Sequence, residues 1–131
     1  MIEVKQIRED EGFESKPYQD HLGNWTFGIG FTFITEEESV AVLKLRLSAI
    51  LASLNAQLHW YADLPIEVKN IMLNMAYQLG VSGLLGFTKT MVLLKNERWV
   101  AAADEMLDSK WARQTPERAN RLSDRLRKVC C

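Results

Sequence analysis

Residues 11–30 read EGFESKPYQDHLGNWTFGIG, and this stretch decides the fold. From position 13 to 34, aromatic and β-branched residues alternate with small or polar ones, a pattern typical of short strands. The pair Gly23-Asn24 supplies a tight turn, and Gly28 and Gly30 interrupt the run that follows. We therefore expect a small three-stranded antiparallel sheet lobe at about 13–34, built around one hairpin.

A short helix is expected on the N-terminal side of this lobe. Val4, Ile7 and Arg8 lie on one face at helical spacing, and Gly12 stands where a helix often ends in a glycine. Glu11 is then the last residue of that helix, directly before the predicted sheet.

Everything after the sheet is predicted to be helical. Thr35 to Glu38 has the form of a capping box, which opens a long connecting helix at about 36–58. Further apolar periodicity predicts a helical lobe at about 64–129. The fold class is α+β: a small sheet lobe joined by a long helix to a C-terminal helical bundle, in a single domain spanning 1–131.

Composition excludes several classes of function. The 131 residues carry a net charge of −1, which argues against non-specific nucleic-acid binding. Cys130 and Cys131 are adjacent, so they cannot form a disulfide framework, and no metal-binding constellation is visible. We expect no cofactor, no metal, no signal peptide and no apolar run long enough to span a bilayer.

The candidate catalytic groups are Glu11, Asp20 and Thr26. A glycosidase needs one carboxyl that stays protonated and one that stays ionised. The negative end of the first helix and its acidic neighbours favour the protonated form at Glu11, whereas Asp20 lies in a loop where water keeps it ionised. Taken alone, however, a charged run such as 8–11 is usually a solvated helix face rather than a catalytic site.

The combination of motifs is more specific, and it resembles the phage lysozyme family. In that family a Glu is followed after eight residues by an Asp and after five more by a Thr, which is the spacing found here. Further similarity extends over nearly the whole chain, through residues 74–80, 86–88, 98–99 and 111–121. The resemblance implies a lysozyme fold and a muramidase that cleaves the β-1,4 bond between N-acetylmuramic acid and N-acetylglucosamine in peptidoglycan.

The resemblance also implies roles for individual residues. Glu11 would be the general acid, Asp20 would position or activate the attacking water, and Thr26 would help to hold that water. This branch of the family inverts the anomeric configuration. The positions that match substrate-contacting residues are Thr32, Tyr77, Gln78 and Thr90, and Arg118 matches an arginine that pairs with the catalytic glutamate.

Some positions depart from the family pattern. Phe31 replaces a common histidine, Thr32 replaces an apolar cleft residue, and Glu105 stands where an amide is usual. The segment between the sheet and the long helix is also short, so the sheet lobe should be small. For Tyr77, packing in the helical core is nearly as good an interpretation as sugar contact.

Two other functions fit parts of the sequence. A catalytically silent peptidoglycan-binding module would keep Tyr77 and Gln78 but lose one of the three catalytic candidates. A helical nucleic-acid-binding protein could use the arginine-rich segment at 113–128. For the favoured enzyme we expect a monomer that accumulates in the host cytoplasm, acts on peptidoglycan glycan strands, and has no nucleic-acid partner and no membrane span.

Overall fold

The structure, a computed structural model, describes residues 2–129. It contains eight helices and one two-stranded sheet within that range. The chain divides into two compact units, Met1–Leu43 and Lys44–Cys131, called here the N-terminal unit and the helical unit. Cys130 and Cys131 lie outside the described residues.

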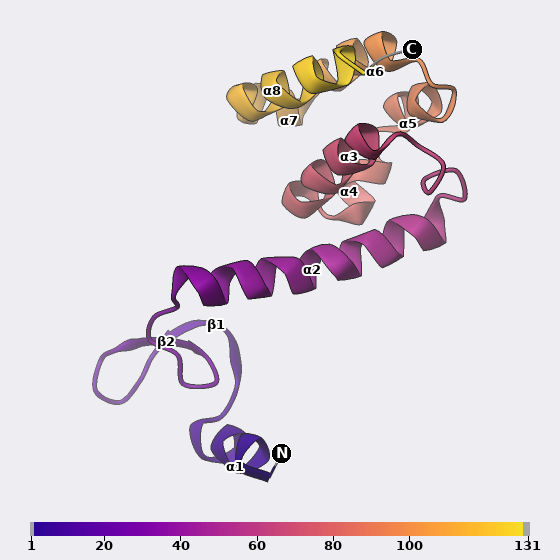
Figure 1. The fold of residues 1–131 in the computed structure, drawn as a ribbon. Coiled ribbons are helices and arrows are strands. Elements are labelled where there is room, and N and C mark those ends of the chain that lie inside the picture. Colours follow the sequence, from indigo (N-terminus) through magenta and orange to yellow (C-terminus); the bar gives the residue numbers. More distant parts are fainter. Residues whose placement is uncertain (1, 130–131) are drawn as a thin grey trace. The chain divides into compact units, whose positions relative to one another are not determined.

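The N-terminal unit begins with helix α1 (Ile2–Glu11), followed by strands β1 (Glu14–Gln19) and β2 (Trp25–Gly28) (Figure 1). As expected, the helix ends at Gly12, which has a φ of 75° and whose N–H donates to the Arg8 carbonyl at 2.8 Å. The strands pair antiparallel, with Tyr18 opposite Thr26.

The predicted third strand is wrong. The chain after β2 turns back through Gly28 and Gly30, both at positive φ, and makes a single bridge between Phe27 and Phe31. Only a few residues then remain before the capping residue of the next helix, so the ladder cannot extend. The α+β fold class is confirmed, with a two-stranded sheet.

Helix α2 (Glu36–Gln57) begins at the predicted capping box. The Thr35 N–H donates to Glu38 Oε1 at 3.0 Å, and the Glu38 N–H donates to Thr35 Oγ1 at 3.1 Å. The first bond is the main cause that lowers the pKa of Glu38 below its usual 4.5, because a hydrogen bond from the Thr35 main-chain N–H favours the carboxylate, and the Thr35 side chain acts in the same direction.

By length and composition alone, α2 could cross a bilayer: its most apolar window has a mean hydropathy of 1.4 and is 6% buried. Lys44 and Arg46 are the only charged residues between positions 39 and 56, so this helix keeps a long apolar stretch. The expectation that no apolar run is long enough to span a bilayer is therefore wrong for this helix. A single helix of this kind is weak evidence for a membrane protein.

The helical unit is completed by six further helices, which include one at Lys110–Gln114 that the sequence reading missed. Helix α6 packs against α5 and α8, and α3 packs against α4 and α8 (Figure 1). Their bounds are α3 (Ile66–Leu79), α4 (Val81–Leu85), α5 (Thr88–Lys95), α6 (Trp99–Leu107), α7 (Lys110–Gln114) and α8 (Pro116–Arg127).

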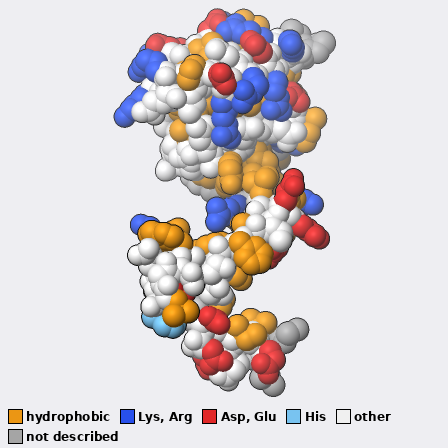
Figure 2. Space-filling view, turned by 90° about the vertical axis from the view of Figure 1, so that its left-hand side faces the viewer, with side chains coloured by type: hydrophobic (Ala, Val, Ile, Leu, Met, Phe, Trp, Pro, Cys, Tyr) orange, Lys and Arg blue, Asp and Glu red, His pale blue; other side chains and the backbone are white. Residues whose placement is uncertain are grey.

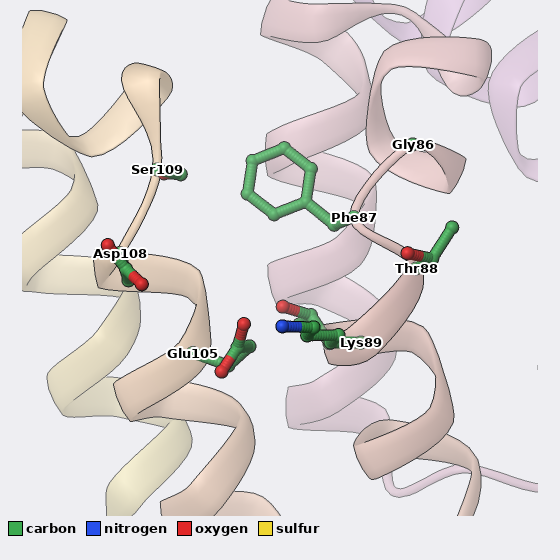
Figure 3. Close-up of a pocket in the computed structure, with 8 residues that line it drawn as sticks. Gly86, Phe87, Thr88, Lys89, Glu105, Asp108 and Ser109 are labelled. Carbon is green, nitrogen blue, oxygen red and sulfur yellow. The ribbon is translucent and has the colours of Figure 1, made fainter.

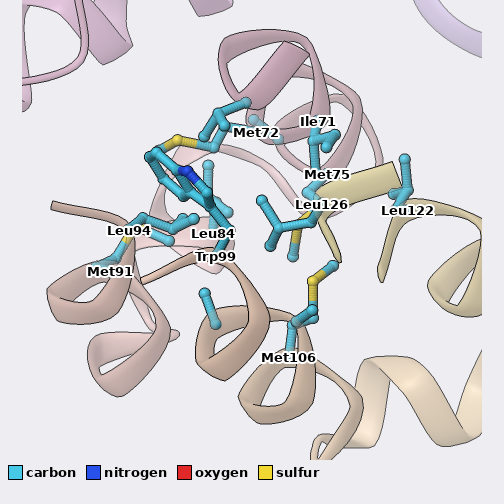
Figure 4. Packing of buried hydrophobic residues seen from close by; sticks show 14 of the residues in the cluster. Ile71, Met72, Met75, Leu84, Met91, Leu94, Trp99, Met106, Leu122 and Leu126 are labelled. Atoms are coloured by element: carbon cyan, nitrogen blue, oxygen red, sulfur yellow. The ribbon is translucent and has the colours of Figure 1, made fainter. Parts of the chain in front are cut away.

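The hydrophobic core lies entirely in the helical unit, between Leu54 and Leu126. Side chains such as Met72, Leu84 and Met106 are at most 1% exposed and interlock at its centre (Figure 4). Burial of this kind contributes roughly 25 cal/mol for each Å² of apolar surface removed from water. This unit is therefore the stable part of the molecule.

The described side chains of the N-terminal unit form no comparable core. Thr26, at 4% exposed, is the only buried residue among the side chains described between positions 3 and 43. Large apolar side chains such as Trp25 and Phe33 are more than half exposed, and hydrophobic groups are visible on this part of the surface (Figure 2). Its geometry must therefore come mainly from hydrogen bonds and glycine turns.

Candidate active site

Asp20 follows β1 and closes the hairpin turn. Its Oδ1 accepts hydrogen bonds from the Leu22 N–H at 2.9 Å and from the Asn24 N–H at 2.8 Å. The Asn24 main-chain bond is the largest influence on this group, and it lowers the pKa of Asp20 below its ordinary 3.8 despite an opposing effect of desolvation. The turn thus favours an ionised carboxylate at this position.

Asn24 connects Asp20 with Thr26. Its carbonyl accepts the Thr26 hydroxyl at 3.1 Å and the Asp20 main-chain N–H at 2.9 Å, while its own N–H donates to the Asp20 carboxylate. Sequence reasoning treated Asn24 only as a turn residue. The structure shows that its main chain joins two of the three catalytic candidates, which their spacing alone does not reveal.

Glu11 is the last residue of α1, and its carboxyl lies against Gly30 in the turn after β2. A Cβ placed on Gly30 would stand 2.6 Å from Glu11 Oε2, closer than any normal contact. Gly30 also has a φ of 70°, in the left-handed region that favours glycine. Gly30 is therefore a second residue that positions a catalytic candidate, and the sequence alone indicates it only as an interruption of the strand pattern.

Phe31 packs its ring over Gly28. A Cβ on Gly28 would meet the Phe31 ring at 2.7 Å, and the Phe27 and Phe31 rings meet edge to face at 5.8 Å between centroids. The phenyl ring therefore belongs to the turn that carries Gly30. Thr32, the neighbouring candidate for substrate contact, is exposed.

The other candidates lie in the helical unit. Tyr77 is 43% exposed and borders a pocket of about 450 Å³ together with Arg46 and Ile50. Gln78 Oε1 accepts a hydrogen bond from the buried Trp111 Nε1 at 2.8 Å, which is a structural contact. Thr90 is 2% exposed and lines a different pocket. Contact of these side chains with substrate stays a prediction.

Arg118 makes a specific contact on α3. Its Nε and Nη2 donate to Asn74 Oδ1 at 3.0 and 2.7 Å, and Nη2 also donates to the Asn74 carbonyl at 3.2 Å. The sequence reading assigned Arg118 as a partner of Glu11. The two residues belong to different units, and their pairing stays a prediction.

Comparison with known proteins finds a matching family and two similar chains. The family model described as phage lysozyme matches residues 8–128. The chain is 25% identical over 155 aligned positions to "Probable T4-type lysozyme 2" of Dictyostelium discoideum, covering 88% of each chain. It is 37% identical over 92 positions to "Probable T4-type lysozyme 1" of the same organism, covering 68% of this chain and 54% of the relative.

The family match includes Glu11, Asp20 and Thr26, and it runs through the helical unit to the end of α8. It therefore covers both the hairpin that holds the carboxylate and the helices that form the core. The chain belongs to the phage lysozyme family.

Proposed function

We propose that this protein hydrolyses the β-1,4 bond between N-acetylmuramic acid and N-acetylglucosamine in peptidoglycan, with inversion at the anomeric carbon. The observation that supports it best is the placement of two carboxyl groups in the N-terminal unit, each held by its own local contacts. Asp20 is held as an anion by two main-chain N–H groups, and the Glu11 carboxyl is placed against Gly30 by a different element.

In the proposed reaction, Glu11 donates its proton to the glycosidic oxygen as the bond from that oxygen to C1 breaks. A water molecule attacks C1 from the opposite face and passes a proton to the Asp20 carboxylate. The new C1–OH bond has the inverted configuration. Inverting enzymes hold the two carboxyls roughly 6.5–9.5 Å apart to leave room for this water.

Thr26 has a supporting role in this scheme. Its hydroxyl donates to the Asn24 carbonyl, so its oxygen lone pairs are left to accept a hydrogen bond from the attacking water. Because Asn24 also binds Asp20, a change at Thr26 should disturb the orientation of the carboxylate as well.

The test is the release of reducing ends from purified sacculi by the wild type, Glu11→Gln and Asp20→Asn. Loss of a general acid lowers the rate by about 10²–10⁴-fold. Glu9→Gln is the matched control, since it removes an exposed carboxylate from the same helix. Activity that survives Glu11→Gln unchanged contradicts the assignment of the acid, and sacculus binding without cleavage by the wild type would identify a silent binding module.

The stereochemistry needs its own measurement. Proton NMR of the first products distinguishes the anomers before they equilibrate. We expect the α-anomer to emerge first from the β-linked substrate, and early β-anomer would show retention instead.

We also propose that Arg118 pairs with Glu11 in the active enzyme, in addition to its contact with Asn74. Replacement by Met removes the charge and keeps most of the apolar stem. A shifted pH–rate profile in Arg118→Met, but not in Arg121→Met on the same helix, supports the pairing, whereas unchanged profiles in both reject it.

A further inference from the structure

The outer face of α2 is a surface that the proposed hydrolysis does not use. The pocket between 86–90 and 105–109, shown in Figure 3, contains Thr90 and so belongs with the predicted substrate contacts. On α2, by contrast, a set of exposed residues recurs at spacings of three or four, which places the set on one side of the helix. The residues of this outer face are Glu37, Ala41, Lys44, Leu45, Ser48 and Ala52.

The opposite side of α2 holds the helix in the core of the helical unit. Leu54 is fully buried, and Ile50 packs against the same core cluster. The outer face therefore cannot turn inward, and Leu45 at its middle is 75% exposed. Val40 and Leu51, which border the outer face, are also exposed. An apolar surface of this kind on a helix marks a contact with another molecule.

Two charges of opposite sign, Glu37 and Lys44, lie on the outer face. Both side chains are exposed, and the ion pairs found among the described residues involve α8 and neither of these charges. Seven residues separate them, so they lie about 10 Å apart along the helix axis. This arrangement is complementary to a surface with the same two charges in reverse order.

We propose that the outer face of α2 binds the same face of a second copy of this chain, with the two helices antiparallel. A twofold axis that passes between positions 40 and 41 brings Glu37 of each copy opposite Lys44 of the other copy. A parallel pair would instead bring the three acids at 36–38 of both copies together, and like charges repel. The inference goes beyond the proposed hydrolysis and departs from the monomer expected from the sequence.

The same register brings apolar groups together. Ala41 lies beside the twofold axis, where its small side chain lets the two helix backbones approach. Leu45 of each copy lies opposite the first turn of the other helix. The segment before that turn then runs along Ser48 and Ala52, and it supplies Phe33, which is 75% exposed in the single chain. A second copy therefore covers apolar side chains that the chain by itself leaves in water.

A bilayer is the other occupant that the composition of α2 would fit. The helix cannot cross a bilayer without removing Leu54 from the core. Lys44 and Arg46, near the middle of the helix, would also enter the hydrocarbon, where charged side chains are costly. A second copy requires no unfolding and gives Lys44 a partner, so the observations favour it.

The first experiment is sedimentation equilibrium of the full chain in a reducing buffer, at concentrations up to about 1 mM, because a short helix pair is smaller than a standard interface and should bind weakly. Glu37→Lys and Lys44→Glu should each weaken the dimer about tenfold or more, since each places like charges at two symmetry-related contacts. The double variant E37K/K44E restores opposite charges and should recover the dimer to within about threefold of the wild type. Glu36→Lys is the matched control, because position 36 lies five helical turns before Leu54 on the inner side of α2.

The second experiment replaces the apolar centre of the face. Leu45→Lys should abolish the dimer, whereas Val92→Lys, at an apolar side chain 59% exposed on α5, should leave it unchanged. Circular dichroism checks that each variant is folded, and the paired charge reversal tests the interface even if Leu45→Lys does not fold. A dimer that survives Leu45→Lys in the folded state, or single charge reversals that the double variant does not rescue, overturns the proposal.

A wild type that stays monomeric over the whole concentration range also overturns it. Vesicles of phosphatidylcholine and phosphatidylglycerol then test the other occupant: co-sedimentation of the wild type, lost in Leu45→Lys, would assign the outer face to a bilayer. None of these measurements depends on cleavage of peptidoglycan, so their failure is distinct from a failure of the proposed hydrolysis.

Discussion

The carboxyl of Glu11 lies directly against the α-carbon of Gly30, so closely that a methyl group on Gly30 would stand 2.6 Å from Glu11 Oε2. The end of α1 and the turn after β2 are thus fitted to each other at the proposed proton donor. Because both residues belong to the N-terminal unit, this contact is a property of that unit by itself.

Gly30→Ala should therefore displace the Glu11 carboxyl and lower kcat by about tenfold or more, since misplacement of a catalytic group by about 1 Å can lower rates 100-fold. The control is Gly80→Ala, where φ is 80° and nothing lies within 4 Å of the added methyl group. Both variants should lose roughly 1 kcal/mol through backbone strain. Thermal melts and sacculus assays check this, and equal loss of activity in the two variants contradicts it.

Asp20→Asn should leave the hairpin intact but make its stability less dependent on pH. The amide oxygen can still accept from Leu22 and Asn24, whereas the charge that these bonds favour is gone. Because the pKa of Asp20 is lowered on folding, the carboxylate stabilises the wild type above its ordinary value of 3.8, and this advantage is lost as the pH falls through the lower folded value.

The measurement for this variant is the difference in melting temperature between wild type and Asp20→Asn from pH 7 to pH 2. We expect a constant difference at neutral pH that shrinks in acid. A carbon-detected NMR titration should give a midpoint for Asp20 below 3.8. A midpoint above 3.8 would rule out stabilisation of the anion by the turn.

Thr35→Ala should destabilise α2 by about 1 kcal/mol, because it removes the hydroxyl that accepts from the Glu38 N–H. Glu37→Gln is a suitable comparison, since it alters a neighbouring acid in the same turn of helix. Circular dichroism during urea unfolding measures the change. If the two variants unfold at the same midpoint, the capping box contributes nothing to the stability of the helix.

Gln78→Leu should destabilise the helical unit by about 1–3 kcal/mol, because it leaves the N–H of Trp111 unpaired at a site only 4% exposed. Gln78→Glu keeps an acceptor oxygen and should recover most of the loss. A Gln78→Leu variant as stable as the wild type, but with a raised KM, would favour the sugar-binding role and argue against the structural one.

Local sequence signals predicted the helix boundaries well. The capping box at Thr35 and Glu38 fixes the start of α2, and Gly12 marks the end of α1. In each case the hydrogen bonds join residues only three or four positions apart, so the short sequence motif contains both partners. The prediction of a third strand was wrong for a reason that local strand propensity does not report. Phe31 has a side chain that suits a strand, but the tight turn before it allows a single bridge to Phe27 and no further strand pairing.

The spacing of Glu11, Asp20 and Thr26 predicted the candidate site, but the contacts that support these residues could not be predicted from the sequence. Asn24 acts through its main chain, which any residue type possesses. The bond between Gln78 and Trp111 joins positions 33 residues apart, and no local periodicity reports such a contact. The capping box predicted where α2 begins but not how little of it is buried: Leu54 is the only buried residue of that helix.

The scarcity of buried side chains around the hairpin has an evolutionary consequence. A loop held by main-chain hydrogen bonds can be lengthened, shortened or given different side chains without disturbing the packed helices that stabilise the fold. The relative with 155 aligned positions, more than this chain has residues, already carries extra segments. The proposed catalytic carboxyls and the hydrophobic core thus lie on separate parts of the chain, so the hairpin can change in sequence while the packed helices stay the same.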